Sequence, residues 1–144
     1  MRLLLAFFLL AAAPAFAQDA DFDQAVRDTL SGDPAEYRQV IGAFQQAVRD
    51  GDAAAAAALV SYPIAVTVAG DDREIGDADA FAAAFPEIVT PAIAAAVLDQ
   101  AIGDMFVNAE GVMLGDGEVW VSGVCLDDAC ARSEVRVITI QSGP

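Results

Sequence analysis

The chain has 144 residues, 22 aspartates and glutamates against 7 arginines, no lysine, no histidine and a formal net charge of −15. So acidic a surface repels phosphate backbones and anionic headgroups, and we therefore expect no nucleic acid among its partners. The absence of histidine excludes Ser-His-Asp and Cys-His catalysis and histidine-ligated metals, and the absence of lysine excludes Schiff-base chemistry. We expect no metal site and no cofactor.

The amino terminus has the pattern of a secretory signal. Arg2 precedes an apolar run over residues 3–13, Pro14 breaks it, and Ala15 and Ala17 place small residues where a signal peptidase reads the chain. The run is too short to span a bilayer, and no cysteine follows it for a lipid anchor. We predict a signal peptide over residues 1–17 and a periplasmic or secreted mature protein with no stable membrane anchor after cleavage.

A short helical lead is predicted over residues 18–32, followed by one domain over residues 33–141. In the lead, Phe22, Val26 and Leu30 recur at the four-residue spacing of a helix face.

Two helices are predicted at the start of the domain. Asp33 followed by Pro34 is a helix start, and Gly51 is the matching end. Asp52 then caps a second, alanine-rich helix that continues to about Val60.

A strand and further helices follow. The β-branched run 64–68 predicts a strand, and residues 73–75 a short return strand. Asp77 begins another helix, which Pro86 interrupts, and residues 91–98 form a last helical stretch.

The last third of the chain predicts β structure, with strands over residues 101–108, 112–114, 118–125 and 131–140. Helices that precede a set of antiparallel strands are typical of an α+β fold. We predict N-terminal helices packed on a strongly curved, mostly antiparallel sheet.

The two cysteines, Cys125 and Cys130, are predicted to form a disulfide at the mouth of the last hairpin, facing one another across its strands. A redox role is the alternative. It is disfavoured because the spacing is not Cys-x-x-Cys and because Asp127 and Asp128 would raise a thiol pKa. This register would turn Trp120 toward the helices.

The chain resembles the nuclear-transport-factor-2-like superfamily, whose fold is also called the cystatin-like α+β cone, in its uncharacterised secreted bacterial branch. The resemblance rests on the stretches Phe44…Gly51-Asp52, Ser61-Tyr62-Pro63 and Gly111…Trp120. It implies a cone-like domain over residues 33–141. The superfamily contains ketosteroid isomerase-like and polyketide cyclase-like enzymes, dehydratases and non-catalytic binding modules, so the fold does not choose a function.

The candidate site is an apolar pocket lined by Tyr62, Phe106 and Trp120. A carboxyl group beside it, Glu118 or Asp104, would have a pKa raised by desolvation and could act as a general base, with the Tyr62 hydroxyl as a second donor. The alternative is that Glu118 lies solvated at the start of its strand and that Trp120 is an ordinary core residue.

The leading hypothesis is an exported, non-catalytic domain that binds a small apolar ligand or a protein partner, with a homodimer through the sheet face as one form of it. A cofactor-free isomerase or dehydratase that uses Glu118 or Asp104 is the first alternative. An acidic inhibitor or immunity-type protein for a basic partner is the second, favoured by the charge. The acidic stretch 71–79 could hold a cation through oxygen atoms alone, but a solvated loop explains it better.

Export predicts where the mature chain begins. The protein recovered from the periplasm or medium of a bacterial host should have the intact mass of a chain that starts at Gln18, with the disulfide closed. A chain that starts at Met1 and remains in the cytosol with both thiols reduced would contradict the signal peptide.

Overall fold

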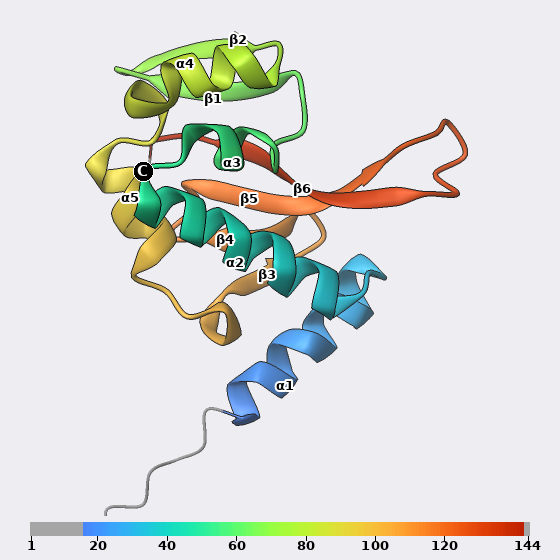
Figure 1. Ribbon diagram of the computed structural model, residues 1–144. Helices are drawn as coiled ribbons and strands as arrows, with labels where there is room; N and C mark the ends of the chain where they lie inside the picture. Colours follow the sequence, from blue (N-terminus) through green and yellow to red (C-terminus); the bar gives the residue numbers. More distant parts are fainter. Residues whose placement is uncertain (1–15, 143–144) are drawn as a thin grey trace, which may run out of the picture.

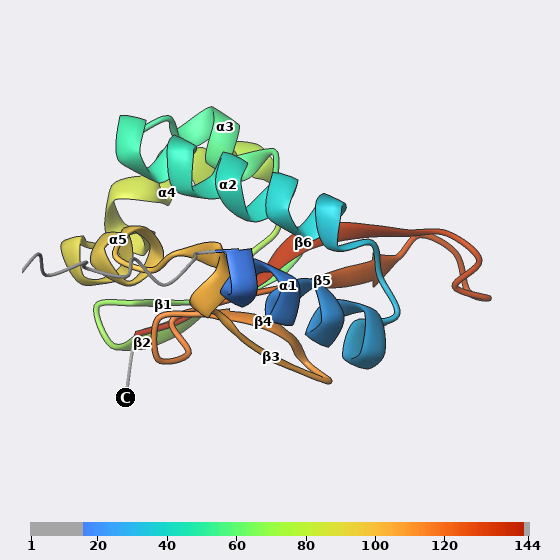
Figure 2. The same cartoon turned by 90° about the horizontal axis from the view of Figure 1, so that it is seen from below.

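A computed structural model describes residues 16–142 of the chain, and nearly all of the predicted signal peptide, 1–17, lies outside the described residues. The protein has an α+β fold, as predicted, with N-terminal helices that precede a six-stranded mixed sheet. Four of the helices, α2 to α5, lie on one side of this sheet (Figures 1 and 2).

The helical elements are α1 (Phe16–Ala25), the π-helix η1 (Val26–Leu30), α2 (Pro34–Asp50), α3 (Ala53–Ala57), α4 (Ala78–Ile88), α5 (Pro91–Leu98) and the 3-10 helix η2 (Ile102–Asp104). The predicted caps at Asp33, Asp52 and Asp77 are confirmed, since each carboxylate accepts a hydrogen bond from a backbone N–H of the first turn. Pro86 does not interrupt its helix, because α4 continues through it to Ile88.

The strands are β1 (Ile64–Val68), β2 (Asp71–Ile75), β3 (Phe106–Asn108), β4 (Gly111–Leu114), β5 (Val119–Cys125) and β6 (Ser133–Ile140). They follow the order β2-β1-β6-β5-β4-β3 across the sheet, and only the β1–β6 pair is parallel. The predicted strand 101–108 is therefore corrected: its first half is η2, and only Phe106–Asn108 joins the sheet.

The register of the last hairpin also differs from the predicted one. Cys125 pairs with Ser133, whereas Cys130 lies in the connecting loop with a φ of 51°. The predicted disulfide does form, with the two Cα atoms 4.8 Å apart. The disulfide joins the end of β5 to a loop residue. If the two cysteines faced one another, the loop would contain only residues 126–129, but it extends over residues 126–132 and includes Cys130.

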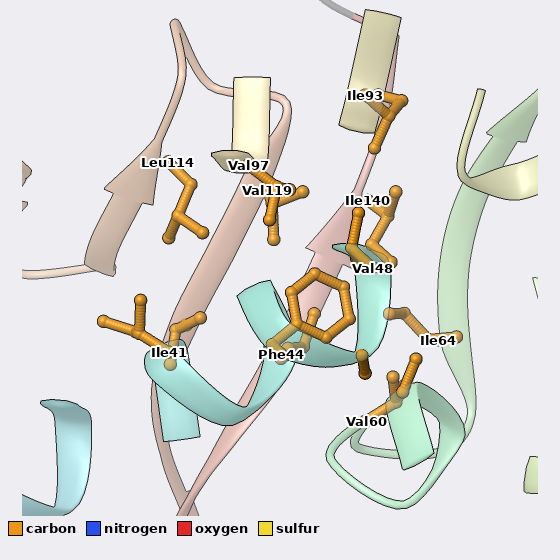
Figure 3. Packing of buried hydrophobic residues seen from close by; sticks show 14 of the residues in the cluster. Ile41, Phe44, Val48, Val60, Ile64, Ile93, Val97, Leu114, Val119 and Ile140 are labelled. Carbon is orange, nitrogen blue, oxygen red and sulfur yellow. The ribbon is translucent and has the colours of Figure 1, made fainter. Parts of the chain in front are cut away.

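The core lies between α2 and the helix-covered face of the sheet (Figure 3). Ile41, Phe44 and Val48 repeat at helical spacing on α2 and are buried. They meet the completely buried Val119 of β5 and Ile140 of β6. Successive side chains of a strand point to opposite faces of the sheet. The strand neighbours of Val119 and Ile140 therefore face away from the helices.

The lead helix α1 is attached to α2 by one arginine. Arg38 Nε donates to Asp23 Oδ1 at 2.8 Å and Nη1 to Asp19 Oδ1 at 3.1 Å, while its guanidinium lies 4.8 Å from the centre of the Phe22 ring. Phe22 and Val26 are buried, as their spacing predicts. The contact between α1 and α2 therefore combines ion pairing, cation–π attraction and burial of apolar side chains.

Two consecutive residues of α2 hold the β5–β6 hairpin, which extends past its neighbouring strands (Figure 1). The Tyr37 hydroxyl accepts a hydrogen bond from Gly123 N at 3.1 Å, and Glu36 Oε1 accepts one from Val135 N at 3.2 Å. Gly123 and Val135 are paired across the hairpin, so α2 satisfies an outward N–H on each of its two strands.

This arrangement predicts that Tyr37→Phe lowers the free energy of unfolding by about 1 kcal/mol, because the part-buried hydrogen bond from Gly123 N to the Tyr37 hydroxyl is lost. Urea unfolding measures the loss, and amide hydrogen exchange should accelerate at Gly123. Tyr62→Phe is the matched control, since the Tyr62 hydroxyl bonds only the nearby Ala57 carbonyl. Equal acceleration at Gly123 in both variants would contradict the assignment.

Candidate binding site on the uncovered sheet face

A row of side chains crosses the face of the sheet that the helices leave uncovered. Phe106, Met113, Trp120 and Thr139 are successive register partners on β3, β4, β5 and β6. The strand neighbours of Met113 and Trp120 are buried on the helix side, and so is Ile140 beside Thr139, so these side chains point the other way. Phe106 shares their face as the register partner of Met113. We call these four residues the outer row. Phe106 is 54% exposed, an unusual state for a large apolar side chain.

The outer row corrects the predicted orientation of Trp120. The predicted register turned Trp120 toward the helices, but the residues on either side of it, Val119 and Val121, are the ones completely buried there. The prediction failed because it assumed that Cys125 faces Cys130, and a shift of register by an odd number of residues exchanges the two faces of a strand.

A bulge in β6 lies beside Thr139, the last member of the outer row. Val121 pairs with Val137 and Trp120 with Thr139, so Ile138 is an extra residue without a partner on β5. Trp120, Ile138 and Thr139 line a hollow of about 380 Å³, together with Glu110 and Gln141. The hollow is open to solvent and combines an indole, an aliphatic side chain and a carboxylate.

Gly117 lies in the turn between β4 and β5, next to Met113 and Trp120 of the outer row. A Cβ atom at Gly117 would lie 3.9 Å from each of three atoms, Trp120 Nε1, Met113 Sδ and Gln141 Nε2. Gln141 Nε2 also donates a hydrogen bond to the Gly117 carbonyl at 2.9 Å. The φ angle of Gly117, 114°, belongs to the region that glycine adopts without strain. The turn before β5 therefore positions the indole edge.

Of the three predicted pocket residues, the structure brings Phe106 and Trp120 into one row and places Tyr62 elsewhere. Tyr62 contacts Phe81 of α4 edge-to-face, with ring centroids 6.2 Å apart, and its hydroxyl donates to the Ala57 carbonyl at 2.8 Å. The hydroxyl is thus engaged among helices, away from the hollow.

The two candidate carboxylates do not meet in an apolar cavity. Glu118 ends the tight turn after β4, and its Oε2 accepts a hydrogen bond from Asp116 N at 2.6 Å. It is half-buried and borders open hollows beside α5. Asp104 is exposed at the end of η2. Apart from the Tyr37 hydroxyl, no polar or charged side chain among the described residues is buried in the core.

The acidic stretch 71–79 serves local structure. Asp72 Oδ1 accepts a hydrogen bond from the Thr67 hydroxyl at 3.0 Å, and Asp77 caps α4. Over residues 16–142 no three histidine, cysteine or acidic side chains are placed to hold a metal ion. The sheet edge β2 is exposed and charged, a composition that discourages pairing with another strand.

In the part of the chain that the structure describes, no single helix is long and apolar enough to cross a membrane. Only α4 and α5 taken together reach that length and composition, and they meet at a 97° bend.

Comparison with known proteins returned no match: no family model, curated protein or solved structure is similar to this chain.

Sequence reasoning found Phe106 and Trp120 and missed Glu110, Met113 and Ile138. Asn108 signalled the turn that presents Glu110, since its Oδ1 accepts from Glu110 N at 2.8 Å. Nothing in the sequence indicated the bulge at Ile138, because a single extra residue leaves the run of β-branched side chains unchanged.

The surroundings of the two tyrosines, which are the only ones in the chain, predict a late titration. Burial raises the pKa of Tyr37, and burial and then the nearby Asp77 charge raise the pKa of Tyr62 from 10.0 to about 12. Both hydroxyl groups keep their protons to higher pH in the native state than in the unfolded state. Their contribution to the free energy of unfolding is therefore fully present below pH 10 and is lost as the pH rises toward about 12. Phenolate absorbance should appear at higher pH in native protein than in urea-unfolded protein. Coincident titration curves would contradict this environment.

Proposed function

We propose that this protein is an exported, non-catalytic binding domain that docks a protein partner on the outer row of its sheet. The observation that carries the proposal is Phe106, which is 54% exposed in line with Met113 and Trp120. Large apolar side chains that gather on a solvent-facing surface are characteristic of interaction sites, and aromatic residues dominate the energy of such contacts.

Two further features support a binding role outside the cytosol. The cysteines are joined in a disulfide, which oxidising compartments maintain. The aromatic side chains of the outer row are carried by paired strands, and a rigid scaffold lowers the entropy lost when a partner binds.

The apolar-ligand reading has weaker support, because the hollow at Trp120 is open and includes the Glu110 carboxylate. The isomerase or dehydratase alternative has still weaker support. Its candidate residues lie on separate elements and line no common hollow: Glu118, Asp104 and Tyr62. The resemblance to nuclear-transport-factor-2-like proteins stays a prediction; a domain of helices on one face of a sheet is compatible with it.

Site-specific photo-cross-linking tests the docking surface. Benzoylphenylalanine at position 106 replaces one exposed aromatic ring by another, and irradiation in the cells that export the protein should yield a discrete protein adduct. The same probe at Ala43, which is exposed on α2, should yield none because it lies on the helical side of the molecule.

Mass spectrometry of the adduct identifies the partner, and a second copy of this chain would identify a homodimer. Absence of any adduct at position 106, or the same adduct at both positions, would refute docking through the outer row. Adding Trp120→Ala to the position-106 probe should remove the adduct, and circular dichroism checks that the fold is kept.

A further inference from the structure

We propose that the hollow beside Trp120 is a receptor for a cationic side chain, arginine or lysine, of a basic partner segment. This inference rests on the proposed docking through the outer row and specifies the chemistry of what is docked. Its residues are Glu110, Trp120 and Ile138, with Thr139 and Gln141 at the border.

The composition of the hollow suits a cation with an aliphatic stem. The face of an indole attracts a guanidinium or ammonium group through its quadrupole, and a carboxylate beside it adds a charge-assisted hydrogen bond. Ile138, which the bulge turns outward, provides apolar surface for the methylene groups of the same side chain. A purely apolar ligand would instead have to desolvate Glu110 without compensation.

The cation has to come from another molecule, because every arginine in the described part of this chain already contacts a partner other than Glu110. Its arginines are engaged elsewhere: Arg27, Arg38, Arg73, Arg132 and Arg136 pair with carboxylates, and Arg49 bonds Gln46. The whole chain contains no lysine. Glu110 itself is exposed at the β3–β4 turn, where an incoming side chain can reach it.

The charge of the whole protein favours the same kind of partner. A formal charge of −15 raises the local concentration of cationic segments and speeds their encounter with the surface. The same charge opposes a second copy of this acidic chain on the outer row. Long-range attraction and the local chemistry of the hollow therefore select the same class of partner.

Trp120 is the only tryptophan of the chain, so its fluorescence reports this hollow directly. We would titrate the oxidised mature protein with a blocked tetra-arginine peptide at about 0.15 M salt, where long-range attraction is screened. The uncharged control is the tetra-citrulline peptide, which has nearly the same shape. The arginine peptide should change the emission saturably, and the citrulline peptide should bind at least roughly fivefold more weakly.

The matched variants are Glu110→Gln and Asp128→Asn, which each remove one negative charge. Asp128 lies in the exposed loop that follows the far end of β5, whereas Trp120 is the second residue of that strand. Glu110→Gln should weaken the arginine peptide by roughly fivefold or more, while Asp128→Asn should leave its affinity nearly unchanged.

Equal binding of the arginine and citrulline peptides, or equal losses in the two variants, would overturn the cation receptor. If it fails while the position-106 adduct still forms, docking through the outer row stands and only its chemistry is wrong. If the adduct also fails, the docking surface itself is refuted.

Discussion

The packing of α2 across β5 and β6 is the interaction on which the rest of the structure depends. Ile41 and Phe44 exclude water from the sheet, and burying such side chains stabilises a fold by about 1.5–3 kcal/mol each. The same helix supplies the polar contacts that hold the hairpin, through Glu36 and Tyr37, and the arginine that attaches α1, Arg38. One helix thus covers the core, aligns the longest strands and docks the amino-terminal lead.

This packing decides which face of the sheet remains open. With Val119 and Ile140 turned toward α2, strand alternation sends Trp120 and Thr139 to the opposite face. The bulge at Ile138 reconciles the two ends of β6, because without the extra residue an inward Val137 and an inward Ile140 could not both occur. The hollow beside Trp120 is a consequence of the way the core is filled.

The chemistry of the molecule is concentrated at its surface. In the described part of the chain, the Tyr37 hydroxyl is the one polar side-chain group in an otherwise apolar core. The hollow on the uncovered face combines aromatic and aliphatic side chains with the carboxylate of Glu110, and the thioether of Met113 lies beside Trp120 in the same row. An acidic protein with such a face is suited to recognition, where charge guides the encounter and apolar contact provides most of the affinity.

Local chemistry in the sequence determined the α+β class, the helix starts at Asp33, Asp52 and Asp77, and the disulfide, because caps, turns and a lone cysteine pair act within a few residues. It also determined the charge and the absence of lysine and histidine, which restrict both catalysis and partners. Only the tertiary structure decided that Trp120 faces outward and shares a hollow with Glu110. Strand register depends on pairing between segments far apart in the chain, and a shift of a single residue reverses the direction of every side chain on a strand.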